Sequence, residues 1–242
     1  MASIVALVLA GGENDELAKS QAVAHKADVI VNGKPLFEPV LVALQNNKIA
    51  KTIYIGSLDS QYSNYVDIVV KAGASFVESL EIGFAAAKKI EAKKILIITA
   101  DLPFISKSTI DSFISNSPDA DLIYPIISKK TSLKQFPNQN RTYAKFIEGR
   151  FTGGNAILLK PKIVPRLLGF ADKAYKARKS PMRLAFLIGF DIFIGLLVGS
   201  SSLSKLERRV GKLLAADVKT YICKDASLGA DIDKLEHLQN IN

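Results

Sequence analysis

The stretch IVALVLAGG, from Ile4 to Gly12, decides the fold that the sequence predicts. Its first six residues, Ile4–Leu9, are apolar and mostly branched, which predicts a buried strand. Two glycines follow at once, and glycine at the carboxyl end of a parallel strand lets backbone N–H groups approach a ligand. That edge of an α/β sheet is where nucleotides bind. A plain tight turn would use the same two glycines, so the pair alone does not establish a nucleotide site.

The strand pattern returns along the chain and alternates with helical spacing. Further strands are predicted at Thr52–Ile55, Val66–Val70, Ile95–Thr99 and Leu122–Ile127. Helices are predicted at Pro35–Gln45, with Pro35 in the first turn, at Leu80–Ile90, and at Ser108–Ser115, with Ser106 as the cap. This alternation is typical of an α/β fold with a doubly wound, mostly parallel sheet and helices on both faces.

The second half of the chain departs from this alternation after Pro125. Arg141–Ile147 and Asn155–Leu159 predict antiparallel or mixed additions to the sheet, and Val218–Cys223 predicts a last strand. Before that strand, Lys162–Leu214 has a helical pattern and is expected to form a helical insert near the C-terminus. No repeat or linker interrupts the chain, so residues 1–242 are expected to form a single domain.

The composition is that of an ordinary globular protein, with 48% hydrophobic and 23% charged residues. The 32 basic and 23 acidic residues give a net charge of +9, which suits nucleic acid, an anionic membrane surface or anionic small substrates. No nucleic-acid-binding module is recognisable, so anionic small substrates are the preferred explanation. Cys223 is the only cysteine, and the N-terminal run indicates a strand rather than a signal peptide. We therefore expect a cytoplasmic protein.

One apolar segment raises the question of a membrane. Ala185–Gly199 is nearly all apolar, but it contains Asp191 and is shorter than the ~20 residues that cross a bilayer. The basic residues between Lys173 and Arg183 would suit interfacial attachment. Burial against the rest of the protein is the simpler interpretation. We therefore expect no stable membrane insertion, and a role for the insert in an acceptor pocket or a subunit interface, which leaves a homodimer open.

Three aspartates and two lysines are candidates for phosphate chemistry. Asp101 ends a predicted strand in the sequence TADLP, where a carboxylate can hold magnesium against phosphates, although a turn or cap aspartate would look the same. Asp231 and Asp233, in the sequence GADID, form a second carboxylate pair after the last predicted strand. Lys26 or Lys34 could neutralise triphosphate oxygens, or could be ordinary surface charges.

Five short motifs occur in the order seen in one enzyme family. They are LAGG at Leu9–Gly12, KA at Lys26–Ala27, GKPL at Gly33–Leu36, TADLP at Thr99–Pro103 and DID at Asp231–Asp233. In this order they resemble the nucleotidyltransferases similar to molybdenum-cofactor guanylyltransferase, the MobA-like NTP transferase family. The resemblance spans roughly residues 3–160 and 218–240. It implies a sheet of the nucleotide-diphospho-sugar transferase type.

The resemblance also implies roles for individual residues. The nucleotide would be bound by Leu9, Ala10, Gly11 and Gly12 together with Lys26. Lys26 and Asp101 would be catalytic. Asp101 would also be the principal ligand of Mg²⁺ or another divalent cation, Asp233 the second ligand and Asp231 the weaker candidate. The acceptor-binding loop of sugar-phosphate members is resembled by Thr152, Gly153, Gly154 and Asn155, although a glycine turn between strands would look the same.

The sequence departs from the family pattern in two places. Acidic residues follow the glycines, at Glu13-Asn14-Asp15-Glu16, and no arginine precedes Lys26, which leaves the nucleotide pose and the catalytic efficiency open. The insert at Lys162–Leu214 exceeds the guanylyltransferase pattern, so molybdopterin is not implied as the acceptor.

The sequence as a whole predicts a metal-dependent nucleotidyltransferase. It would move a nucleoside monophosphate from a nucleoside triphosphate to a small phosphorylated or hydroxyl acceptor and release pyrophosphate. Its partners would be the triphosphate and a small anionic acceptor, not nucleic acid. Two alternatives stay open. A nucleotide-sugar-dependent glycosyltransferase could use the Asp-x-Asp pair at Asp119-Ala120-Asp121, although this pair precedes its strand, and the missing arginine would suit a non-catalytic nucleotide-binding protein.

Overall fold

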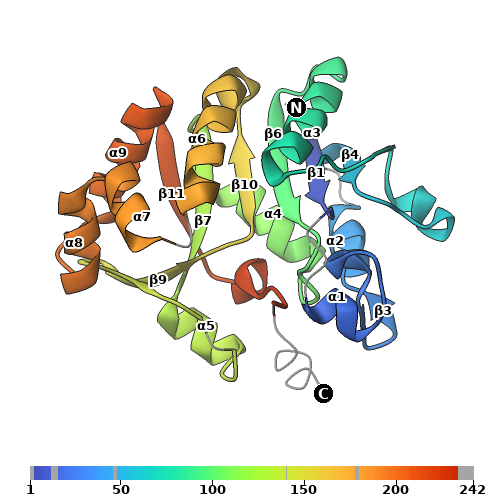
Figure 1. The fold of residues 1–242 in the computed structure, drawn as a ribbon, viewed down its shortest axis with the longest axis horizontal. Coiled ribbons are helices and arrows are strands. Elements are labelled where there is room, and N and C mark those ends of the chain that lie inside the picture. Colours follow the sequence, from blue (N-terminus) through green and yellow to red (C-terminus); the bar gives the residue numbers. More distant parts are fainter. Residues whose placement is uncertain (1–2, 12–15, 46–47, 140, 178–179, 234–242) are drawn as a thin grey trace.

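A mixed sheet runs through the middle of the molecule, with helices packed along it (Figure 1). The computed structural model describes residues 3–11, 16–45, 48–139, 141–177 and 180–233. Within these residues the sheet has nine strands, in the order β5-β4-β1-β6-β10-β7-β9-β8, with β11 beside β7. The strands are β1 (Ile4–Leu9), β4 (Ile49–Ile55), β5 (Ile68–Val70), β6 (Lys94–Thr99), β7 (Leu122–Ser128), β8 (Ala144–Phe146), β9 (Gly149–Gly153), β10 (Ala156–Leu159) and β11 (Val218–Cys223).

The strand directions bring several loops to one edge of the sheet. β1 is parallel to β4 and β6, with Leu7 opposite Ile53 on one side and Ile97 on the other. β10 is antiparallel to both β6 and β7, so β6 and β7 run in the same direction, and β11 is parallel to β7. The carboxyl ends of β1, β6, β7 and β11 therefore share one edge. The predicted doubly wound, mostly parallel α/β fold is confirmed, and a single domain over residues 1–242 stays a prediction.

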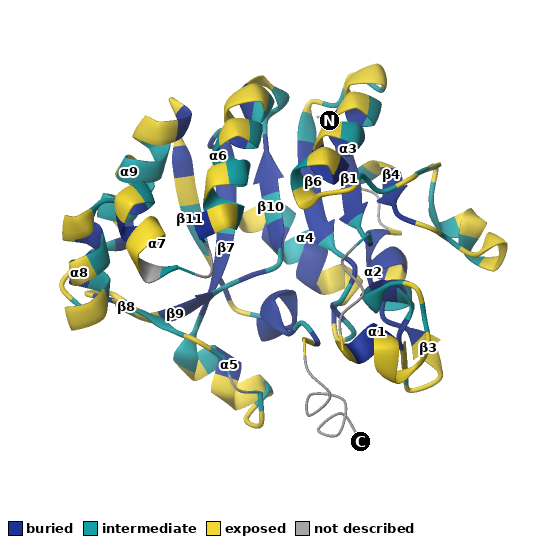
Figure 2. Cartoon of the chain, viewed as in Figure 1, coloured by how far each residue is buried: buried dark blue, intermediate teal, exposed yellow. Residues whose placement is uncertain are grey.

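Helices cover the two faces of the sheet over two separate apolar cores. Successive side chains of a strand point to opposite faces, so Val8 packs in the first core and Leu7 in the second. Figure 2 shows the central strands β1, β6, β7 and β10 as mostly buried. The first face is covered by α2 (Phe37–Leu44) and α4 (Lys107–Asn116), and the second by α3 (Phe76–Lys89), α6 (Val164–Ala177) and α9 (Leu203–Leu214).

One predicted helix begins later than the sequence pattern indicated. Pro35 does not lie in a first helical turn, because it pairs with Ile30 in a small hairpin of β2 (Ile30–Val31) and β3 (Lys34–Pro35). The hairpin turns through Asn32 and Gly33, whose φ angles of 51° and 78° lie in the left-handed region that suits these residue types. The helix α2 therefore begins only at Phe37.

One further strand boundary differs from the sequence patterns, two elements were not predicted, and one predicted cap is confirmed. The strand predicted from Val66 begins at Ile68, because the 3₁₀ helix η2 (Ser60–Tyr65) precedes it. The strand β9 was not predicted, since it begins and ends with glycine, and the helix α5 (Lys129–Gln135) forms in a stretch that has no apolar periodicity. Ser106 caps α4 as predicted, accepting a hydrogen bond from the Thr109 amide.

The predicted helical insert forms α6 to α9, but its apolar segment is not buried as expected. Two helices, α7 (Pro181–Ile188) and α8 (Phe190–Val198), meet at Gly189, whose φ of 99° favours glycine. One side of this pair packs on the protein, and six large apolar side chains are exposed: Met182, Phe186, Phe190, Ile194, Leu197 and Val198. Apolar residues occur on every side of these two helices. When one side packs against the protein, the apolar side chains of the other side are therefore exposed to solvent. In the described part of the chain, no helix has the length and apolarity to cross a membrane.

Candidate active site

The loop after β1 lies at the shared carboxyl edge of the sheet, where its backbone packs closely against neighbouring segments. The amides of Ala10 and Gly11 both donate to the carbonyl oxygen of Ile55, at 3.0 and 3.1 Å. A Cβ on Gly11 would overlap the side chain of Ala72, so packing alone requires glycine here. Gly12 lies outside the described residues. Nucleotide binding by Leu9–Gly12 therefore stays a prediction.

Lys26 extends to this edge from the start of the 3₁₀ helix η1 (Lys26–Asp28). Its Nζ donates to Oδ2 of Asp101 at 2.6 Å and also to Oδ1 of Asp233. Burial alone would lower the pKa of Lys26, but the charges and hydrogen bonds of the two carboxylates outweigh it and raise that pKa. Lys26 is therefore a fixed cation held between two carboxylates.

Asp101 occupies the predicted position, directly after the central strand β6. The hydroxyl of Thr99 donates to its Oδ1 at 2.6 Å, so each carboxylate oxygen has a partner once Lys26 is counted. The Ala100 amide donates to the carbonyl oxygen of Leu9 at 3.1 Å, which places Asp101 at the same sheet edge as Gly11. Asp101 and the glycine loop therefore share the edge at which an α/β sheet binds nucleotides.

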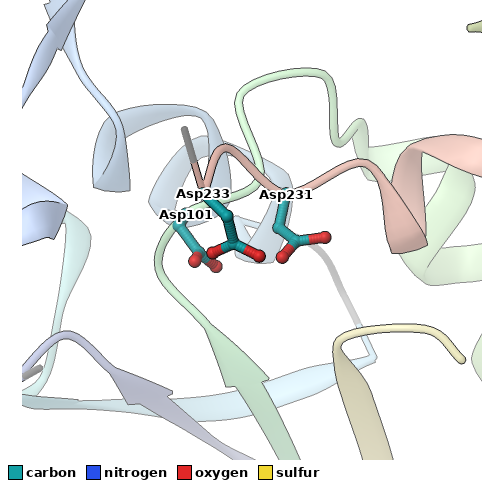
Figure 3. Close-up of side chains that lie close together, drawn as sticks. All are labelled: Asp101, Asp231 and Asp233. Atoms are coloured by element: carbon teal, nitrogen blue, oxygen red, sulfur yellow. The ribbon is translucent and has the colours of Figure 1, made fainter. Parts of the chain in front are cut away.

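Asp231 and Asp233 arrive from the segment that follows β11 and the 3₁₀ helix η4 (Ala226–Gly229). Ile232, between them, is buried against Leu17, and its amide donates to the carbonyl oxygen of Asp101 at 3.3 Å. One carboxylate oxygen from each of the three aspartates lies within 4.8 Å of the other two. Figure 3 shows the three carboxylates directed into the same space.

Arg141 is a site residue that the sequence patterns did not single out. Its Nη1 donates to Oδ1 of Asp231 at 2.6 Å. Its Nε donates to the hydroxyl of Thr152 at 3.4 Å, and its Nη2 to the carbonyl oxygen of Gly153 at 3.5 Å. In the sequence it is only the first residue of a predicted strand, and no motif spacing links it to Asp231, which lies 90 residues further on.

The predicted acceptor-binding loop lies beside this guanidinium, where β9 turns into β10. Its first two residues, Thr152 and Gly153, end β9. The amides of the next two donate to the carbonyl oxygens of Pro125 and Leu228, both at 2.8 Å. The side-chain Nδ2 of Asn155 is buried and has no hydrogen-bond partner in the part of the chain that the structure describes. Acceptor binding by Thr152–Asn155 stays a prediction.

The charge balance of the site fits an additional cation. In the part of the chain that the structure describes, three carboxylates converge on two basic groups, those of Lys26 and Arg141. Burial, together with the hydrogen bond and charge of Asp233, raises the pKa of Asp231 to about 6 against the lowering effect of Arg141. Carboxylate oxygens are the ligands that hard divalent cations prefer. The donor set therefore suits Mg²⁺ or a similar ion.

Other candidate residues lie outside this cluster. Lys34 pairs with Glu38 at 2.7 Å on the surface, so it is not brought to the three aspartates. Asp119 and Asp121 precede β7 and pair with lysines at the sheet edge opposite Asp101. Glu16 begins α1 (Glu16–Ser20) and is exposed, whereas residues 13–15 lie outside the described part.

Comparisons with known proteins bear on the family and the fold. The family model described as MobA-like NTP transferase domain matches residues 6–183. A protein from Thermus thermophilus described as a hypothetical transferase is 30% identical, with a TM-score of 0.88 over 98% of this chain and 99% of that chain. No curated protein matches the chain.

Two more distant structures share the fold. A 2-C-methyl-D-erythritol 4-phosphate cytidylyltransferase, also from Thermus thermophilus, has a TM-score of 0.53 at 15% identity, over 99% of this chain and 97% of that chain. The 4-diphosphocytidyl-2C-methyl-D-erythritol synthase from Anaerococcus prevotii has a TM-score of 0.55 at 12% identity, over 99% of this chain and 94% of that chain.

Proposed function

Because the chain belongs to the MobA-like NTP transferase domain family, and so is an enzyme of the nucleotidyltransferase type, we propose the following reaction for it. The enzyme moves a nucleoside monophosphate from a nucleoside triphosphate to a phosphate or hydroxyl oxygen of a small anionic acceptor. Pyrophosphate is released, and a divalent cation such as Mg²⁺ takes part. We place this reaction in the cytoplasm, which the single cysteine of the chain favours.

The observation that carries the proposal is the position of Lys26 between Asp101 and Asp233 at the edge that the glycine loop reaches. A fixed cation beside a carboxylate cluster suits a substrate that is itself a polyanion with bound metal. If Lys26 formed only a structural ion pair, one carboxylate would be enough to neutralise its charge. Here the lysine shares a site with three carboxylates, which supports a role in binding charge that comes from outside the protein.

Asp101, Asp233 and Asp231 would bind the metal ion. One carboxylate oxygen of each lies within 4.8 Å of the other two, which is close enough for all three to bind a single ion. A divalent cation bound there would offset negative charge on the phosphates. The protein's own groups do the remaining work. Thr99 fixes the orientation of the Asp101 carboxylate through its hydroxyl, and Arg141 does the same for Asp231.

In the chemical step, an acceptor oxygen attacks the α-phosphorus of the triphosphate, and the bond from that phosphorus to the pyrophosphate oxygen breaks. Lys26 would stabilise the charge that builds on the leaving pyrophosphate. Thr152–Asn155 would hold the acceptor, with Arg141 beside them as a second cation for an anionic substrate. Neither a covalent enzyme intermediate nor a catalytic histidine is needed.

The glycosyltransferase alternative has less support. Its Asp-x-Asp pair would be Asp119 and Asp121, which precede β7 and lie at the sheet edge opposite Asp101. Asp121 is engaged there with Lys162 at 2.8 Å.

The direct test is a thermal-shift screen of ATP, GTP, CTP and UTP, each with Mg²⁺, followed by pyrophosphate release in the presence of small phosphorylated acceptors. A nucleotide present at 100 times its Kd should raise the melting temperature by about 5–10 °C, because only the folded state binds it. The shift should disappear when EDTA replaces Mg²⁺. If no triphosphate stabilises the protein and none yields pyrophosphate, the proposal is wrong.

A further inference from the structure

The α7–α8 pair carries a continuous apolar surface far along the chain from the active-site motifs. On α8 the exposed residues Phe190, Ile194, Leu197 and Val198 recur at helical spacing and so lie on one face. On α7, Met182 and Phe186 are exposed, and the ring of Phe186 packs edge-on against that of Phe190 with centroids 5.0 Å apart. This contact joins the two helical faces into one surface, which we call the α7–α8 face.

The large apolar side chains of the α7–α8 face are highly exposed to solvent. Its six apolar residues expose between 46% and 71% of their surface. In Figure 2 both helices carry the exposed colour, and α8 lies at the left edge of the molecule. Contiguous apolar surface of this kind on a soluble protein marks a partner or a membrane.

Basic residues are concentrated in the segment that contains the α7–α8 face, and some of them lie at its ends. The segment Lys162–Leu214 contains 11 of the 32 lysines and arginines of the chain but only three of its 23 acidic residues, so it supplies +8 of the net charge of +9. Arg183 is exposed next to Met182 on α7. At the far end of α8, Lys145 of β8 lies beside Gly199.

A cationic pocket lies at the N-terminal end of α8. It has a volume of about 370 Å³ and is lined by Gly189 and Ile192 on one side and by four basic residues of α9 on the other: Lys205, Arg208, Arg209 and Lys212. The acidic residue in its lining, Asp191, is already paired with Lys205 at 2.8 Å. The Nε of Arg209 is buried without a hydrogen-bond partner among the described residues.

From this juxtaposition we infer that the α7–α8 face binds the surface of an anionic lipid bilayer, with its apolar side chains among the acyl chains and a lipid phosphate at the cationic pocket. An apolar helical face with lysines and arginines at its rim is the pattern of an interfacial membrane helix. Each basic residue near an anionic leaflet adds to the attraction. This inference differs from the expectation of no stable membrane insertion, because that expectation assumed that Ala185–Gly199 is buried, whereas its side chains are partly exposed.

The charge distribution argues against a second copy of the chain as the occupant. A two-fold dimer would place the same patch of both copies face to face, so the two basic rims would meet. An anionic bilayer complements the rim instead. Neither helix spans the bilayer in this arrangement, in agreement with their lengths of eight and nine residues.

The test is co-sedimentation of the full chain with vesicles of phosphatidylcholine alone and of phosphatidylcholine with 30% phosphatidylglycerol, at low and high salt. The double variant Ile194→Glu/Val198→Glu changes two exposed residues of the face. Its matched control, Val42→Glu/Val69→Glu, makes the same charge change at residues that are 46% and 48% exposed on α2 and β5. A third variant, Arg208→Gln/Lys212→Gln, removes two cations of the pocket.

We expect the unmodified protein to bind anionic vesicles at least tenfold more strongly than neutral ones, with part of the binding surviving high salt. Ile194→Glu/Val198→Glu should lower binding at least tenfold and the control should lower it much less. Arg208→Gln/Lys212→Gln should lower the preference for anionic lipid by up to about 25-fold, since each of the two cations near the leaflet contributes about fivefold. Nucleotide binding by all variants should stay unchanged, which separates this proposal from the proposed reaction.

Three results would overturn the inference. The first is an absence of vesicle binding by the unmodified protein. The second is an equal loss in the double variant and its control, which would indicate only general electrostatic attraction. The third is a dimer in sedimentation equilibrium that Ile194→Glu/Val198→Glu dissociates while vesicle binding is absent, which would make the α7–α8 face a subunit interface.

Discussion

The guanidinium of Arg141 donates to the carboxylate of Asp231 at 2.6 Å and so connects the three-aspartate cluster to the loop that contains Thr152 and Gly153. Asp231 is largely buried, and its pKa is raised to about 6 mainly by that burial. Removing its cation would leave a buried charge without compensation, which is far less favourable than a paired one. Arg141 therefore holds together the metal side and the acceptor side of the site.

The first prediction concerns Arg141→Gln, which removes one of the two cations that pair with the cluster among the described residues. We expect Mg²⁺ to raise the melting temperature of this variant by several degrees more than it raises that of the unmodified protein, because the metal then neutralises more uncompensated charge. The measurement is a thermal melt with Mg²⁺ and with EDTA. Arg150→Gln is the matched control, since Arg150 lies exposed on the neighbouring strand β9. Equal Mg²⁺ shifts in both variants would contradict the role assigned to Arg141.

The second prediction is that Asp101→Asn abolishes metal-dependent function and leaves the fold intact. Loss of a principal metal ligand should reduce pyrophosphate release by roughly 10²-fold or more, equivalent to several kcal/mol in the transition state. The melting temperature in EDTA should change little, since the side chain sits at the sheet edge. Asp119→Asn, at the opposite edge and 78% exposed, serves as the control. Unfolding of Asp101→Asn would instead assign this aspartate a structural role.

The third prediction separates packing from ligand binding at Gly11. A Cβ at this position would overlap Ala72, so Gly11→Ala should lower the free energy of unfolding by about 1–3 kcal/mol. The double variant Gly11→Ala/Ala72→Gly recreates the space and should recover a large part of that loss. Denaturant unfolding of both variants and of Ala72→Gly completes a double-mutant cycle. Additive effects would mean that the overlap with Ala72 is not what requires glycine.

The fourth prediction concerns stability in acid and involves Asp121, at the far edge of the sheet. Its carboxylate accepts from Lys162 at 2.8 Å and from the Asp217 amide at 3.2 Å, and the hydrogen bond from Lys162 is the largest effect that lowers its pKa. A carboxyl whose pKa is depressed by folding stabilises the protein above its unfolded pKa of about 3.9, and this contribution is lost as the pH falls through the folded value.

Asp121→Asn should therefore lower the free energy of unfolding at pH 7 by roughly 1 kcal/mol. The difference should shrink as the pH falls below about 4, and it should disappear only below the depressed folded pKa, where the native carboxyl is protonated. Urea unfolding at pH 7, 5 and 3 gives the comparison, with Asp217→Asn as a control at an exposed neighbour. A difference that persists unchanged at pH 3 would rule out the charge as its origin.

The exposure of the side chains in Ala185–Gly199 could not be predicted from the periodicity of the sequence. Ala185–Gly199 is apolar all round, and such a pattern suits a buried helix as well as one with a face left in solvent. The sequence correctly indicated that the segment is too short to span a bilayer. Which residues are exposed depends on how α7 and α8 pack against β8 and α9, and this packing is set by residues far from the segment in the chain.

Local pattern predicted the strands of a mostly parallel sheet, the position of Asp101 at the carboxyl end of one strand and the glycine pair at the carboxyl end of another. Each follows from the period of apolar residues and the direction of one strand, which a short window of sequence contains. Only the tertiary structure decided that Lys26 lies between Asp101 and Asp233, 75 and 207 residues away, and that Arg141 pairs with Asp231. Such pairs form because the strand order and the burial of Ile232 bring distant segments together. The spacing of residues within a short stretch of sequence does not contain this information.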